Sequence, residues 1–304
     1  DLLQYVPFFT QVSLQAGTAR RDFVEMTEEI GIQTGGIGAG YTPLAQLDCP
    51  DDVFSLVAYS GKCLQAKLPQ MIEILAEIFR DCRLDDVTRL REIARAARAG
   101  MESRVNNAGH SFVVTRLAAG QSVAGKYAEM TGGLEYFYFL DRLVRNLEND
   151  PAAVIARLNA VRNCLFRRAG VRVHLTAGRD ELNALTPLLP QVWDSLTDNI
   201  VQAPTFDFPD FNVNEGLMIP SKVQYVGKGL NLFAEGLQRH GAFAVLKKLL
   251  GRDYLWNKVR VQGNAYGCFC SLDSLTGHFY CCSYRDPNLE ETLAVFDAIA
   301  DYLE

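Results

Sequence analysis

The chain has 304 residues, 48% of them hydrophobic and 22% charged, which fits a folded protein of about two domains with a substantial core. Its formal net charge of −6 argues against a nucleic-acid partner, because such proteins present a basic surface to phosphates. No apolar run reaches the roughly 18 residues that a membrane span needs, and no signal-peptide pattern is present, so a soluble protein without a membrane partner is predicted.

Both ends of the chain indicate a fragment. Asp1 is not a methionine and leads directly into an apolar-rich stretch. Leu303 and Glu304 end the chain inside an expected helix, without a capping glycine. We therefore expect a piece of a longer protein.

The first part of the chain is expected to contain strands and helices in alternation. Residues 35–40 are rich in glycine, but no Lys-Ser/Thr pair follows, so they predict a strand and not a phosphate loop. Residues 53–59 predict a buried strand, and apolar positions between Met71 and Cys82 recur at helical spacing.

A long helical insertion is predicted at about 85–168, where apolar residues continue at helical spacing. Residues 171–175 alternate and predict a further strand, and residues 180 to about 196 predict a helix. The arginines near the start of the insertion are diluted by acidic residues, so they indicate a solvated helix face. They are Arg89, Arg91, Arg95 and Arg98.

A proline- and phenylalanine-rich linker is predicted at 202–213, between a first domain at 1–201 and a second at 214–304. The second domain should begin with strands around 217–219 and 223–226. A helix over 253–259, a hairpin turning at 274–277 and a helix from Leu289 should follow.

The two halves repeat one pattern. Offset by 225 residues, Phe54 and Tyr59 fall on Phe279 and Tyr284, and apolar positions of the following helices also coincide. The repeat predicts an α+β fold of two related domains. Each would be a mainly antiparallel sheet with helices packed on one face, the first domain being truncated at its N-terminus and carrying the insertion, the second truncated at its C-terminus.

Metal chemistry is disfavoured for this chain. In the predicted hairpin Cys268 and Cys270 share one sheet face, whereas the adjacent Cys281 and Cys282 point to opposite faces, so four thiolates cannot converge. We expect buried, reduced cysteines. The four histidines lack metal-ligand spacing and are expected to be structural: His110, His174, His240 and His278.

Arg260 and Tyr266 are the remaining candidates for chemistry, supported by Gly263 and Asn264 between them. A guanidinium fork and a phenolic hydroxyl can both donate to a peptide carbonyl or a developing oxyanion. The competing interpretation is an arginine that caps its helix and a tyrosine packed in a sheet.

Residues 253–267, 225–229, 283–289 and, more loosely, 20–25 resemble the presequence-protease clade of the insulinase (pitrilysin) family. The resemblance implies the C-terminal half of a peptide-degrading zinc metalloendopeptidase. It also implies that the zinc is bound by the absent N-terminal half, so that this chain has no catalytic or metal-ligating residues and is inactive alone. Arg260 and Tyr266 would match the arginine and tyrosine that contact the substrate near the scissile bond.

The implied partners are the N-terminal catalytic half of the same polypeptide and unfolded peptide substrates. The implied compartment is the bacterial cytoplasm first and a mitochondrial or plastid matrix second. An alternative function remains open, because relatives of this fold also occur as catalytically silent binding or scaffold subunits.

Overall fold

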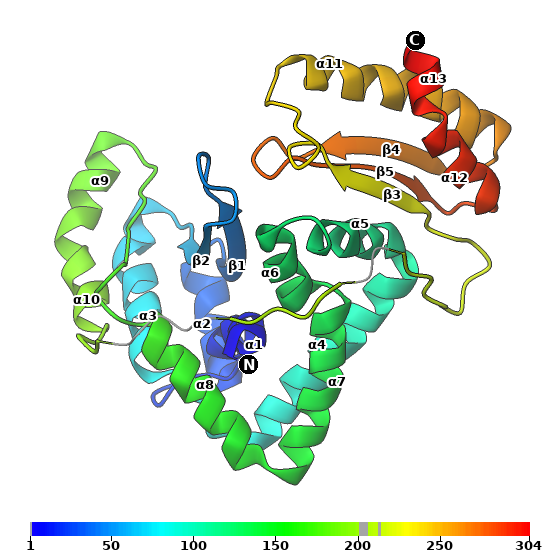
Figure 1. Cartoon of the computed structure of the whole chain (residues 1–304). Helices are drawn as coiled ribbons and strands as arrows, with labels where there is room; N and C mark the ends of the chain where they lie inside the picture. The colour runs from blue at the N-terminus through cyan, green and yellow to red at the C-terminus, as the bar shows by residue number, and fades with distance from the viewer. Residues whose placement is uncertain (1, 201–205, 212–213) are drawn as a thin grey trace. The chain divides into compact units, whose positions relative to one another are not determined.

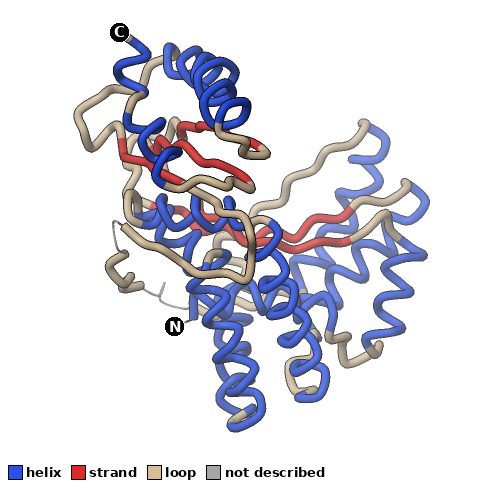
Figure 2. Tube along the Cα trace, turned by 90° about the vertical axis from the view of Figure 1, so that its right-hand side faces the viewer, coloured by secondary structure: helices blue, strands red, loops and turns tan. Residues whose placement is uncertain are grey.

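The computed structural model describes residues 2–200, 206–211 and 214–304. Helices form most of this part of the chain and accompany two small antiparallel sheets, which confirms the predicted α+β fold (Figures 1 and 2). No helix in the described ranges combines the length and the apolar character that crossing a membrane requires.

The chain divides into two compact units, neither of them continuous in sequence. The predicted domains, 1–201 and 214–304, remain a proposal. Residues 99–137 of the predicted insertion group with the C-terminal part, and much of the predicted linker at 202–213 lies outside the described residues. The first unit comprises Asp1–Thr42, Leu56–Arg98 and Tyr138–Asp207, and the second comprises Pro43–Ser55, Ala99–Phe137 and Phe208–Glu304.

The first unit begins with the expected order of helices and strands. Asp22 caps one of the helices by accepting hydrogen bonds from the backbone of Val24 and Glu25, and the Glu25 side chain accepts from Asp22 N in return. The predicted strand at 53–59 and the helix that follows it are confirmed. The elements are α1 (Leu2–Gln15), α2 (Phe23–Gln33), β1 (Ile37–Ala45), β2 (Val53–Gly61), η1 (Gln65–Lys67) and α3 (Leu68–Asp81).

The predicted insertion is helical throughout most of its length. Its arginines are engaged, as a solvated helix face requires: Arg95 pairs with Glu148 at 2.9 Å and Arg98 pairs with Asp141. Asp150 caps the last helix by accepting a hydrogen bond from Ala153 N at 3.1 Å. The helices are α4 (Val87–Asn107), α5 (Gly109–Ala119), α6 (Val123–Gly132), α7 (Leu134–Asn149) and α8 (Pro151–Leu165).

Two predictions after the insertion need correction. Residues 171–175 form no strand, because alternation of apolar residues supplies no pairing partner and none of the described segments hydrogen-bonds to them as a ladder. The predicted helix at 180–196 is broken into α9 (Arg179–Leu185), η2 (Thr186–Leu188) and α10 (Leu189–Asp194). Pro187 and Pro190 each lack the N–H that a continuous helix would use.

The second unit contains a three-stranded antiparallel sheet in the order β3-β5-β4. Its hairpin confirms the predicted turn. The predicted strands at 217–219 and 223–226 are wrong: the strand starts only at Gly227, and Gln224 makes just an isolated bridge to Asp286. The elements are β3 (Gly227–Asn231), α11 (Ala242–Leu249), η3 (Leu250–Tyr254), η4 (Trp256–Gln262), β4 (Gly267–Leu272), β5 (His278–Tyr284), α12 (Glu290–Asp297) and α13 (Ile299–Leu303).

Helices cover this sheet on both faces. Cys268, Cys270 and Cys281 point toward the side of η3, η4 and α12, where they join a cluster with Leu255 and other apolar residues. Cys282 points the other way, toward α5, and its thiol contacts the carbonyl of His110 (Figure 1). The predicted distribution of the cysteines over the faces is confirmed. Coverage by α5, which comes from the insertion, was not predicted.

His278 links β5 to the helical side of this unit. Its Nδ1 lies 2.5 Å from Gln121 Oε1, so Nδ1 carries the proton and donates, and Nε2 is buried without a partner. Burial lowers the pKa of His278 to about 4. The imidazole is therefore neutral in the folded protein at neutral pH.

This low pKa predicts a dependence of stability on pH. Below pH 6.5 the unfolded chain protonates His278 while the folded chain does not, so stability falls as the pH drops from about 6.5 toward 4. In His278→Gln, the slope of unfolding free energy against pH in this window should be shallower by about one proton. Urea denaturation at several pH values measures it. The matched control is His174→Gln at an exposed histidine, and a wild-type slope in His278→Gln would contradict the assignment.

Candidate functional site

The site is built on a helix of unusual pitch. Both η3 and η4 are π-helical, and the buried side chains of Leu255 and Val259 anchor them to the core of the second unit. π-Helical turns are rare and occur often at functional sites. The helix predicted at 253–259 is therefore present but longer and wider than expected, and Arg260 lies in its last turn.

Gly263 and Asn264 reverse the chain between η4 and β4. A Cβ atom at Gly263 would lie 2.7 Å from the carbonyl oxygen of Val259, so a larger residue would force the backbone to move. Asn264 has a φ of 62°, in the left-handed region that asparagine tolerates better than most residues. The two predicted supporting residues thus shape the turn that separates Arg260 from Tyr266.

Arg260 spans this turn. Its Nη1 donates to the carbonyl oxygen of Ala265 at 3.0 Å, and the guanidinium carbon lies 5.4 Å from the Tyr266 ring centroid and 5.7 Å from that of Trp256. In the described part of the chain Arg260 forms no ion pair and no other hydrogen bond. The capping role is therefore real, and it uses one of the five N–H donors of the guanidinium.

Tyr266 is 65% exposed although it immediately precedes β4. Its backbone N–H donates to the carbonyl of Arg285 at 3.2 Å, and its ring meets the edge of the Tyr284 ring at 5.8 Å between centroids. No described residue hydrogen-bonds to its hydroxyl. The phenol is thus held at its base and is open to solvent at its polar end.

A second turn, at 285–288, supports the first. Asn288 Nδ2 donates to the carbonyl of Gly263 at 2.6 Å. Asp286 is fully buried and accepts hydrogen bonds from Asn288 N at 2.9 Å and Thr292 Oγ1 at 2.8 Å. Arg285 also adopts a left-handed backbone, with a φ of 49°. The sequence did not predict the supporting role of Asp286 and Asn288, because only contact across the fold gives it.

The site offers donors and no means of bond cleavage by itself. Arg260 and Tyr266, predicted six residues apart, lie together and present guanidinium and hydroxyl donors suited to a carbonyl or an oxyanion. No three histidine, cysteine or acidic side chains of the described residues gather as a metal site would require. The described part of this chain therefore does not fit a zinc ion.

Two family models match the chain: a peptidase-associated domain over residues 1–143 and the "PreP C-terminal domain" over residues 214–304. A curated relative, presequence protease 1 (chloroplastic/mitochondrial) of Arabidopsis thaliana, is 33% identical over 304 residues, covering 100% of this chain and 28% of that protein. Protein HypA of Clostridium perfringens is 31% identical over 303 residues, with 100% and 31% covered.

Among solved structures, a crystal structure of pitrilysin covers 97% of this chain and 31% of its own, with a TM-score of 0.45 and 14% sequence identity. The chain thus spans less than a third of the length of each of these three proteins.

Proposed function

Because the chain belongs to the insulinase (pitrilysin) family of peptidases and corresponds to a C-terminal part of such a protein, we propose that it is the non-zinc half of a peptide-degrading metalloendopeptidase. In this function it closes the substrate chamber and contacts the peptide near the scissile bond. The observation that carries the proposal is the pairing of Arg260 with an exposed Tyr266 whose hydroxyl has no protein partner among the described residues.

The geometry supports a role in holding the substrate carbonyl. The guanidinium of Arg260 is fixed by the Ala265 carbonyl on one side and lies near two aromatic rings on the other, so few conformations compete with the productive one. Its remaining N–H groups and the Tyr266 hydroxyl can donate to one oxygen. Charge that develops on that oxygen strengthens such hydrogen bonds, so they favour the transition state over the bound peptide.

The rest of the chemistry is assigned to the N-terminal half of the same polypeptide. We propose that this half binds the zinc and supplies the base, that the substrates are unfolded peptides, and that the present chain is inactive alone. The Arabidopsis relative is named for chloroplasts and mitochondria, so an organelle matrix stands beside the bacterial cytoplasm as the proposed compartment.

The second candidate function is a catalytically silent binding or scaffold subunit of the same family. A scaffold gains nothing from a strained turn that presents an unpartnered phenol and an arginine with free donors. The left-handed backbone of Asn264 and Arg285, one in each of the two turns, therefore favours the peptidase.

Metal removal tests the proposal. The intact protein should hydrolyse unstructured peptides of some tens of residues, a zinc chelator should lower the rate by roughly 10-fold or more, and added zinc should restore it. The 304-residue chain alone should show only background hydrolysis. Hydrolysis by the isolated chain would contradict the division of labour, and peptide binding by the intact protein without any hydrolysis would favour the scaffold.

A further inference from the structure

A cavity of about 450 Å³ lies within the first unit, between α1, α7 and α8. Arg142 and Asn146, one helical turn apart on α7, line it together with Arg157 of α8 and Tyr5 of α1. Its volume lies in the range of small-molecule sites. The site discussed above, around Arg260, belongs to the second unit and shares no residue with this cavity.

Both arginines of the cavity have donors to spare. Arg142 Nη2 donates to Gln4 Oε1 at a long 3.4 Å, and Arg157 makes no hydrogen bond within the described residues. Neither arginine forms an ion pair there, unlike Arg95 and Arg98 on the neighbouring helix. Unpaired guanidinium forks that face one cavity match the planar oxygens of an oxyanion.

Tyr5 adds a buried polar group to the same cavity. Its side chain is only 8% exposed, yet no described residue hydrogen-bonds to its hydroxyl. Buried hydroxyl groups nearly always have a partner. Burial raises the pKa of Tyr5, and the charges of Arg157 and Arg142 oppose that rise, which places both guanidiniums near the phenol. The hydroxyl is therefore positioned to donate to the same anion.

The remaining lining limits what the anion can be. Phe139 meets Tyr5 edge to face at 4.9 Å between centroids, and with Val154 it gives the cavity an apolar surface that a bare inorganic ion would leave unused. The carboxylate of Asp150 also lines the cavity, which reduces the excess positive charge and disfavours a dianion.

We propose that this cavity binds a carboxylate carried on an apolar or aromatic group. The ligand is either a free organic acid or the C-terminal residue of a peptide. Arg142 and Arg157 hold the carboxylate, the Tyr5 hydroxyl donates to it, and Phe139 and Val154 contact the apolar part.

Isothermal titration calorimetry of the intact protein tests this with 3-phenylpropionate, the peptide Ala-Ala-Phe and the C-terminal amide of that peptide. At least one of the two acids should bind saturably, and the amide should bind at least about 10-fold more weakly than its acid. Binding of both acids or of one alone identifies the source of the carboxylate. Failure of both acids to bind overturns the proposal, as does an amide that binds as well as its acid.

Variants locate the binding. The double variant Arg142→Gln/Arg157→Gln changes two exposed side chains, so the fold should persist, and the affinity for the binding acid should fall at least about 10-fold. Ala153→Leu, which narrows the apolar lining, should weaken binding as well. Arg145→Gln on α7, an exposed arginine outside the cavity, is the matched control. Unchanged affinity in the double variant, or equal competition by inorganic phosphate, would overturn the proposal.

Discussion

Arg260→Ala and Tyr266→Phe in the intact protein should each lower kcat for peptide hydrolysis by roughly 10²-fold, because each removes a donor to the oxygen on which charge develops. Tyr266→Phe deletes an oxygen that has no partner in the described part of the chain, so the free energy of unfolding should change by about 0.5 kcal/mol or less. Steady-state kinetics with one unstructured peptide, together with urea denaturation, measures both quantities.

Arg260→Ala needs a closer control, because it also removes the hydrogen bond to the Ala265 carbonyl. That bond contributes about 1 kcal/mol to stability, far less than is needed to unfold the protein. Arg260→Lys keeps the charge but loses the planar fork, and should recover only part of the activity. Arg252→Ala, at an exposed arginine of η3, is the matched control. Wild-type turnover in both Arg260→Ala and Tyr266→Phe would remove this pair from the reaction.

How well the sequence predicted this region depends on how local each feature is. The hairpin of β4 and β5, the opposite faces of Cys281 and Cys282, and the pairing of Arg260 with Tyr266 were all predictable. Each follows from alternation, turn residues or a short spacing along the chain. The support from Asp286 and Asn288 was not predictable, because it crosses between two turns that are far apart in the sequence.

The errors elsewhere have the same origin. Residues 171–175 alternate like a strand, but a strand exists only where another segment supplies hydrogen-bond partners. The start of β3 was placed several residues early, since apolar residues before Gly227 suggested pairing that begins only at the glycine. The π-helical pitch of η3 and η4 is a matter of backbone hydrogen bonding that apolar periodicity does not distinguish from an α-helix.

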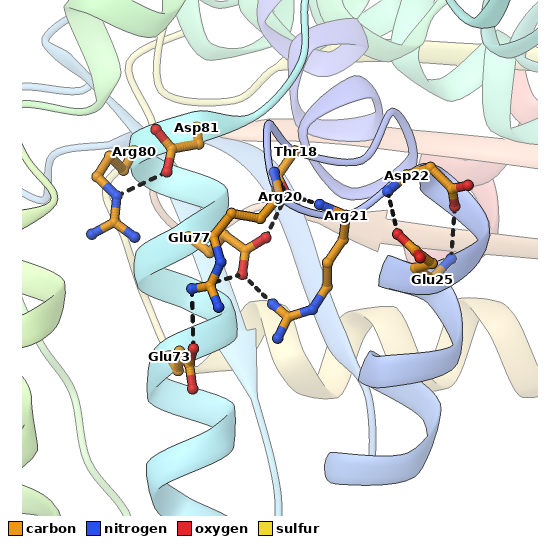
Figure 3. A network of polar contacts seen from close by, with 9 residues as sticks. All are labelled: Thr18, Arg20, Arg21, Asp22, Glu25, Glu73, Glu77, Arg80 and Asp81. Atoms are coloured by element: carbon orange, nitrogen blue, oxygen red, sulfur yellow. Dashed lines mark hydrogen bonds and ion pairs between the residues drawn. The ribbon is translucent and has the colours of Figure 1, made fainter.

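A polar network in the first unit makes the opposite case, in which one buried charge organises a loop (Figure 3). Glu77 of α3 is fully buried and accepts from Thr18 Oγ1 and from the guanidinium of Arg21, with Arg20 at 3.8 Å. Thr18 Oγ1 in turn accepts from the backbone N–H groups of Arg20 and Arg21 at 3.2 and 3.1 Å. The loop that leads into the capping box of α2 is thereby tied to α3.

Glu77→Ala should therefore lower the free energy of unfolding by about 3–5 kcal/mol, since it leaves Arg21 and the Thr18 hydroxyl without their acceptor and opens a cavity. Glu77→Gln keeps the shape and one acceptor oxygen, so its cost should be smaller, about 1–3 kcal/mol.

Glu73→Ala, one turn earlier on α3, removes a half-exposed carboxylate that pairs with Arg20 at 3.1 Å. That change should cost about 1 kcal/mol or less, because solvent screens an exposed ion pair. Urea denaturation at pH 7 ranks the three variants, and hydrogen exchange of residues 17–33 localises the loss. If Glu77→Ala were no more destabilising than Glu73→Ala, the buried carboxylate would not be what holds this loop on α3.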